Sequence, residues 1–160
     1  EFDDWPSDRI SDARSVTESF KDAISFDGAV FNGDRTKDNP NILWDGNDSI
    51  KLIDHALALA SVYNQGGSPD PSDSFPEREF KNHATVPSLR KATIDPNKYD
   101  EVYNDWRRQI DDDYLQKIRG YIPDGWERER QNDLDKIFSF LKCRESSFAD
   151  MSSVIKSVVS

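Results

Sequence analysis

Two aspartates and two asparagines surround a segment that is predicted to fold as a β-hairpin. Asp34 precedes the hairpin, Asp54 ends it, and Asn39 and Asn41 lead into its first strand. Residues 41–54 carry two short apolar runs separated by an Asp-Gly dipeptide, which is a strong hairpin signal. Antiparallel pairing outward from this turn returns Asp54 to the side of the asparagines. Two carboxylates and a carboxamide then converge, a ligand set suited to magnesium held against nucleotide phosphates.

The order of these residues resembles the catalytic and metal-binding segments of the HipA-like kinases and of their relatives, the phosphatidylinositol 3- and 4-kinases. The matching strings are NGDR (32–35), NILW (41–44) and LIDHALAL (52–59). A looser similarity to the C-terminal helices of bacterial HipA-like kinases continues in IPDGW (122–126) and FLKCRE (140–145). The resemblance covers residues 25–155. It implies a phosphotransferase that uses ATP and magnesium to phosphorylate a hydroxyl, expected to be that of a protein serine or threonine.

The resemblance also implies a role for each candidate residue. Asp34 would be the catalytic aspartate that orients the acceptor hydroxyl, and Asp54 would bind the magnesium that bridges the phosphates. An asparagine between them would be a further metal ligand. The usual spacing of the family selects Asn39, whereas the position directly before the first strand selects Asn41, which we favour. The structural alternative is that Asp34 is a turn residue and that Asp54 caps the following helix.

Three further polar residues have competing interpretations. Arg35, next to Asp34, is a candidate contact for the nucleotide cofactor, but we favour a pairing with a nearby carboxylate that fixes the loop. His55 is expected to be neutral and hydrogen-bonded to backbone rather than to tune the site near neutral pH. His83 lies in a stretch without a clear pattern and is expected at the surface. With two histidines and one cysteine, the sequence has too few ligands for a zinc site.

The stretch before Asp34 is short for a complete kinase. Kinases cover the nucleotide phosphates with a loop and grip them with a lysine, both ahead of the catalytic aspartate. The residues before Asp34 contain neither a glycine-rich loop nor a strand that carries such a lysine. We therefore expect a C-terminal lobe that is inactive in isolation. It is a fragment of a longer kinase, a partner of an N-terminal lobe on another polypeptide, or a remnant kept for binding.

The composition argues against several other classes of function. The chain has 160 residues, a net charge of −10 and a single cysteine, Cys143. No run rich in Lys and Arg is present, so direct nucleic-acid binding is not expected. No apolar run approaches the ~20 residues of a membrane span, and a lone cysteine indicates a cytoplasmic rather than an oxidising location. The rival to a kinase is an acidic helical protein-interaction module without chemistry.

The expected fold is a single domain, mainly α with one small β-hairpin, similar to the C-terminal lobe of a HipA-like kinase. After an irregular lead over residues 1–6, a helix that starts near Ser7 or Ser11 carries an apolar stripe to Ile24. Residues 64–76 are rich in Gly, Pro and Ser and predict a loop. Residues 75–96 show no pattern, and further helices are predicted within residues 97–158.

Overall fold

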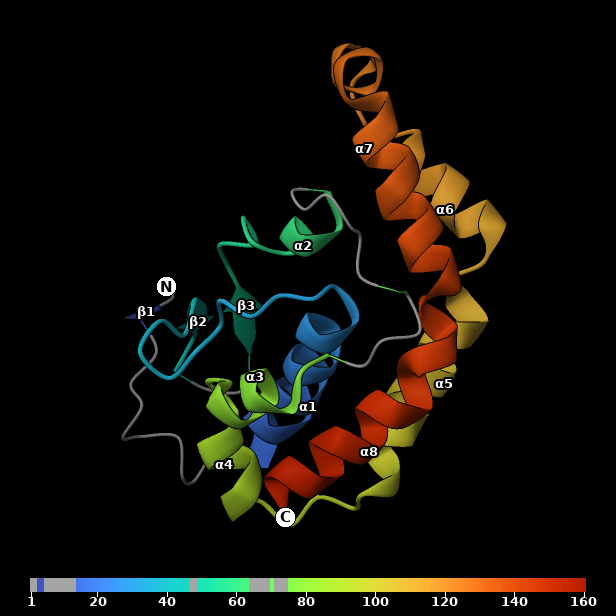
Figure 1. The fold of residues 1–160 in the computed structure, drawn as a ribbon. Helices are drawn as coiled ribbons and strands as arrows, with labels where there is room; N and C mark the ends of the chain where they lie inside the picture. The colour runs from blue at the N-terminus through green and yellow to red at the C-terminus, as the bar shows by residue number, and fades with distance from the viewer. Residues whose placement is uncertain (1–2, 5–13, 47–48, 64–69, 71–74) are drawn as a thin grey trace.

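The computed structural model describes residues 3–4, 14–46, 49–63, 70 and 75–160. Helix α1 (Arg14–Ala29) lies at its centre, with the hairpin on one side and the C-terminal helix on the other (Figure 1). Its buried apolar residues recur at the predicted helical spacing: Val16, Phe20, Ala23 and Ile24. The helix runs further than this stripe, to Ala29. Both predicted starting points, Ser7 and Ser11, lie outside the described residues.

The predicted hairpin is formed by strands β2 (Ile42–Trp44) and β3 (Ile50–Leu52), which pair antiparallel with Ile42 opposite Leu52. Gly46 occupies the turn with a φ of +83°, a conformation that costs a glycine little. A further strand, β1 (Asp3–Asp4), pairs with β2, so the sheet has three strands in the order β1-β2-β3. The expectation of an irregular lead was wrong for Asp3 and Asp4, because these residues pair with the free edge of β2.

The remaining helices confirm a mainly α fold with a small hairpin. Their bounds are α2 (Ala60–Tyr63), α3 (Glu77–Asn82), α4 (Val86–Lys91), α5 (Asn97–Gln109), α6 (Asp112–Arg119), α7 (Asp124–Cys143) and α8 (Phe148–Val159), with a 3-10 turn at Arg144–Ser147. The unpatterned stretch 75–96 thus forms two helices that are too short for periodicity to reveal. Most of the predicted loop 64–76 lies outside the described residues, and its Phe75 is buried.

The core forms where α1, α3, α4, α5 and α8 meet. Its buried members include Phe20 and Ile24 of α1, Phe80 of α3, Tyr103 of α5 and Met151 of α8. Helices α6 and α7 lie side by side and extend away from this core (Figure 1). None of the helices in the described part of the chain is both long and apolar enough to cross a membrane. The core therefore holds α1 along its length, and the chain leaves α1 directly toward Asp34.

Candidate functional site

Asp34 lies in the loop between α1 and β2, within reach of both candidate asparagines. The Nδ2 atom of Asn39 donates to Asp34 Oδ2 at 3.2 Å, and the Nδ2 atom of Asn41 donates to the same oxygen at 3.3 Å. With both amide nitrogens turned to Asp34, the oxygen of each carboxamide is left for another partner. The geometry thus brings both alternatives beside Asp34 and does not choose between Asn39 and Asn41.

Asn41 and Asp54 flank the open end of the hairpin. The backbone N–H of Ile53 donates to the carbonyl of Asn41 at 3.0 Å, which places Asp54 next to this pairing. Asn41 has a φ of +49° and Asp54 a φ of +50°, both in the left-handed region that few non-glycine residues adopt. Such backbone outliers cluster at functional sites. Asn41 and Asp54, both predicted to be metal ligands, therefore have the same unusual backbone conformation at the two ends of the hairpin.

Asp54 itself is exposed, and its Oδ1 accepts the N–H of Ala56 at 3.3 Å. This contact closes a local turn, whereas the next helix, α2, begins only at Ala60. Among the described residues, no group of three or more His, Cys, Asp and Glu lies close enough to hold a metal. The candidate ligands are all oxygen atoms of carboxylates and carboxamides, which would fit magnesium and its retained waters better than zinc.

Arg35 connects the Asp34 loop to both strands of the hairpin. Its side chain is buried, and its Nε donates to Asp27 Oδ2 at 2.6 Å. Its Nη1 donates to the carbonyl of Asn41 and, at 3.4 Å, to the carbonyl of Ile53. The guanidinium therefore faces the protein interior. This geometry favours the interpretation that Arg35 fixes the loop over direct contact with a cofactor.

Asp27, near the end of α1, is the buried centre of these contacts. It accepts hydrogen bonds from Asn32 Nδ2 at 2.9 Å, from Arg35 Nε and from His83 Nε2 at 2.9 Å. Burial alone raises the pKa of Asp27, but its hydrogen bonds and the charge of Arg35 outweigh that effect and hold the pKa below the usual range. Asp27 is thus a buried carboxylate that stays ionised opposite a buried guanidinium.

His83 is buried, so the expectation of a surface position was wrong. The stretch that contains it forms the turn between α3 and α4, which packs against α1. The backbone N–H of Thr85 donates to His83 Nδ1 at 3.2 Å, so Nδ1 must accept and Nε2 carries the proton given to Asp27. Burial lowers the pKa of His83, in keeping with this neutral form.

The turn between α3 and α4 also pairs with the backbone of the Asp34 loop. Ala84 N–H donates to the carbonyl of Arg35 at 3.0 Å, and Lys37 N–H donates to the carbonyl of Asn82 at 3.2 Å. The loop is therefore held on one face by the hairpin and on the other by this turn.

Sequence reasoning missed Asp27 and His83. The available signal was an acidic residue on the apolar face of α1, three positions after the buried Ile24, where a charge requires a partner. The sequence offered nothing to identify that partner, because His83 lies far along the chain in an unpatterned stretch.

His55, the residue after Asp54, touches the same arginine. Its Nε2 lies 3.4 Å from a terminal nitrogen of Arg35. A hydrogen bond to backbone was expected for this side chain, whereas the contact that the structure shows is with a guanidinium. The ring also meets that of Phe26 edge to face, with centroids 5.8 Å apart.

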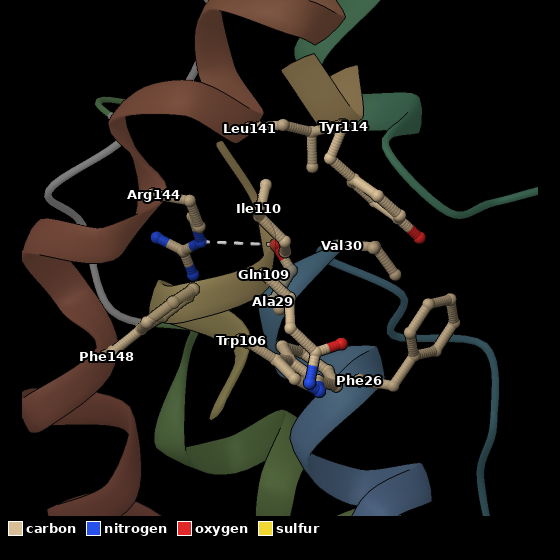
Figure 2. A pocket seen from close by; sticks show the side chains of 10 residues that line it. All are labelled: Phe26, Ala29, Val30, Trp106, Gln109, Ile110, Tyr114, Leu141, Arg144 and Phe148. Atoms are coloured by element: carbon tan, nitrogen blue, oxygen red, sulfur yellow. Dashed lines mark hydrogen bonds between the residues drawn. The ribbon is translucent and has the colours of Figure 1, made fainter. Parts of the chain in front are cut away.

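Phe26 also lines an apolar pocket of about 260 Å³, which lies between α1, α5, α6 and α7 (Figure 2). It is lined by Phe26, Ala29, Val30, Trp106, Gln109, Ile110, Tyr114, Leu141, Arg144 and Phe148. Figure 2 shows Arg144 at its edge, donating to the carbonyl of Ala29 at 3.2 Å. The candidate residues Asp34, Asn39, Asn41 and Asp54, together called the polar cluster below, are absent from the described residues that line this pocket, so the two are separate features.

In a comparison with known families, the chain matches a family model described as HipA-like kinase over residues 8–151. The matched range includes α1, the Asp34 loop, the hairpin and the helices through α7. No curated protein and no solved structure matches the chain. The family match thus covers every candidate residue of the polar cluster.

Proposed function

The chain belongs to the HipA-like kinase family, and on that premise we propose that it supplies the acceptor-orienting and metal-holding half of a phosphotransferase. The observation that carries the proposal is the convergence of Asp34, Asn39 and Asn41 at the open end of a hairpin whose other strand leads into Asp54. Magnesium, when bound, neutralises charge on the phosphates of ATP. The proposed acceptor is a hydroxyl, that of a protein serine or threonine.

Each residue has a defined task in this proposal. Asp34 accepts a hydrogen bond from the acceptor hydroxyl and holds it in line with the γ-phosphate. The carboxylate of Asp54 and the carboxamide oxygen of Asn41 or Asn39 hold the metal. The amide nitrogens of both asparagines, which donate to Asp34 Oδ2, set the direction of its carboxylate.

The described residues before Asp34 form β1 and α1, neither of which resembles a loop that covers phosphates. We therefore propose that this chain acts as a C-terminal lobe and that an N-terminal lobe grips the phosphates. Without that lobe, the same polar cluster supports nucleotide or protein binding at most. The non-catalytic interaction module remains the alternative that the experiments distinguish.

Metal binding tests the proposal on the chain as it stands. Titration calorimetry with Mn²⁺, with and without ATP, is compared for wild type and Asp54→Ala. Asp95→Ala is the matched control, because Asp95 is also exposed and its Oδ1 also accepts a backbone N–H two residues on, from Asn97 at 2.9 Å. We expect Asp54→Ala to weaken binding by about tenfold or more and Asp95→Ala to change it by less than about twofold. Equal heats for wild type and Asp54→Ala would remove Asp54 from the site.

A further inference from the structure

The side chain of Arg35 contacts the backbone of two residues at the open end of the hairpin, Asn41 and Ile53. Its guanidinium donates to the carbonyl of Asn41 and to the carbonyl of Ile53, the residue before Asp54. Both carbonyls belong to the short segments that carry the proposed metal ligands. A shift of this guanidinium therefore moves Asn41 and Asp54 together, and both relative to Asp34, the neighbour of Arg35 in the chain.

The position of Arg35 is in turn set by Asp27. The Asp27 carboxylate is fully buried, forms a 2.6 Å hydrogen bond with Arg35 Nε and pairs its charge. Carbonyl groups alone do not neutralise a buried guanidinium, so without Asp27 this charge would be uncompensated. Asp27 is itself held by Asn32 Nδ2 and by His83 Nε2, which approach from the loop and from the turn between α3 and α4.

We propose that Asp27 is a positioning residue for the phosphotransfer site, acting through Arg35 to fix where Asn41 and Asp54 stand relative to Asp34. The inference rests on the proposed function. Asp27 has no exposed side-chain surface and so reaches neither metal nor nucleotide. Its effect passes through the side chains that it holds: Arg35, and also Asn32, whose Oδ1 accepts the N–H of Asp34 at 3.4 Å. Second-sphere groups of this kind typically change metal affinity by about 10–100-fold when they are removed.

Arg144 supplies the comparison that separates positioning from general support of the fold. It is also a buried arginine, and it donates to the carbonyls of Gly28 and Ala29 at the end of the same helix, α1. It also donates to Met151 Sδ, and its guanidinium lies over the ring of Phe31, 4.4 Å from the ring centroid. We therefore expect a change at Arg144 to loosen the core near the site with less effect on the carbonyls of Asn41 and Ile53, to which Arg35 donates.

The test measures Mn²⁺ affinity in the presence of ATP for wild type, Asp27→Asn, Arg35→Lys and Arg144→Lys, well below the melting temperature of each variant. Lysine keeps the charge of Arg35 but has no planar fork to span Asp27 and the two carbonyls. We expect Asp27→Asn and Arg35→Lys to weaken Mn²⁺ binding by about tenfold or more, and Arg144→Lys by less than about twofold even where its melting temperature falls as far.

The outcomes separate this inference from the proposed function. If wild type binds Mn²⁺ through Asp54, but Asp27→Asn or Arg35→Lys binds within about twofold of wild type, the positioning role is wrong and the proposed function stands. If all three variants lose affinity in proportion to their loss of stability, Asp27 is merely structural and the inference also fails. If wild type shows no binding that depends on Asp54, both the proposed function and this inference fail. Should Asp27→Asn not fold, Arg35→Lys alone decides.

Discussion

Asp27 and Asp54 have the same side chain in opposite surroundings. Asp27 is buried, with three side-chain donors around it, whereas Asp54 is exposed and accepts one backbone N–H. At the residue scale, the first is required to balance a buried charge. We expect the second to contribute little to the fold, as the proposed function requires of a side chain retained for a ligand.

Substitutions of these aspartates should affect stability very differently. Asp54→Asn and Asp34→Asn are expected to leave the free energy of unfolding within about 0.5 kcal/mol of wild type, or to raise it, since each relieves negative charge at the open end of the hairpin. Asp27→Asn is expected to lower it by about 3 kcal/mol, because Arg35 loses its buried counter-charge. Urea unfolding measures all three. A clear loss for both Asp34→Asn and Asp54→Asn would favour their structural roles as turn and cap residues.

The burial of His83 predicts that the free energy of unfolding falls as the pH is lowered below neutrality. Its folded pKa lies below 6.5 because it is buried, with Asp27 and Arg35 as the charged groups that face it. The unfolded chain takes up a proton near pH 6.5 while the folded protein does not, so this stabilisation is present above pH 6.5 and declines as the pH falls. Asp27 has its own effect only below its unfolded value of 3.8.

Between pH 7 and pH 5.5, we expect the titration of His83 to lower the free energy of unfolding by about 1 kcal/mol. His83→Gln keeps a donor toward Asp27 but has no titration in this range, so its curve should be flatter by that amount. His55 is present in both proteins and cancels in the comparison. Identical pH dependence of wild type and His83→Gln in urea unfolding would show that His83 is not held neutral.

At the element scale, the sequence predicted those parts of the site that depend on local signals. The Asp-Gly turn and two apolar runs suffice to predict the hairpin, and pairing from the turn places Asp54 near Asn41. Helices α3 and α4 were missed because each has only 6 residues, too few to show a period. The contact between Asp27 and His83 was missed with them, since it depends on how distant segments pack.

The backbone conformation of the hairpin turn can be tested by comparing alanine substitutions at two glycines, Gly46 in the turn and Gly125 in α7. Gly46 has a φ of +83° and open space around its Cα, so Gly46→Ala adds backbone strain without a clash. We expect it to lower the free energy of unfolding by about 1 kcal/mol. Gly125→Ala, in α7 and equally open, should instead raise it by about 0.5 kcal/mol. Equal effects in thermal unfolding would contradict the assigned turn conformation.

At the scale of the whole molecule, the described residues would provide one side of the proposed phosphotransfer site. The core of α1, α5 and α8 supports the loop and the hairpin, and the turn between α3 and α4 holds the loop from its other face. Positioning and charge stabilisation account for nearly all of the catalysis of phosphoryl transfer. A lobe that supplies only the residues for the acceptor hydroxyl and the metal should therefore be nearly inactive until a lobe that binds the nucleotide phosphates is joined to it.

The central claim is that Asp34 orients the acceptor hydroxyl, and transfer of radiolabel from γ-labelled ATP to protein tests it most directly. Three samples are compared: this chain alone, the chain joined to an N-terminal lobe from its natural upstream sequence, and the joined protein with Asp34→Ala. We predict little transfer by the chain alone, clear transfer by the joined protein, and a loss of about a hundredfold or more in the variant. Undiminished transfer by Asp34→Ala would contradict the assignment of Asp34, and robust transfer by the chain alone would contradict its role as one lobe of two.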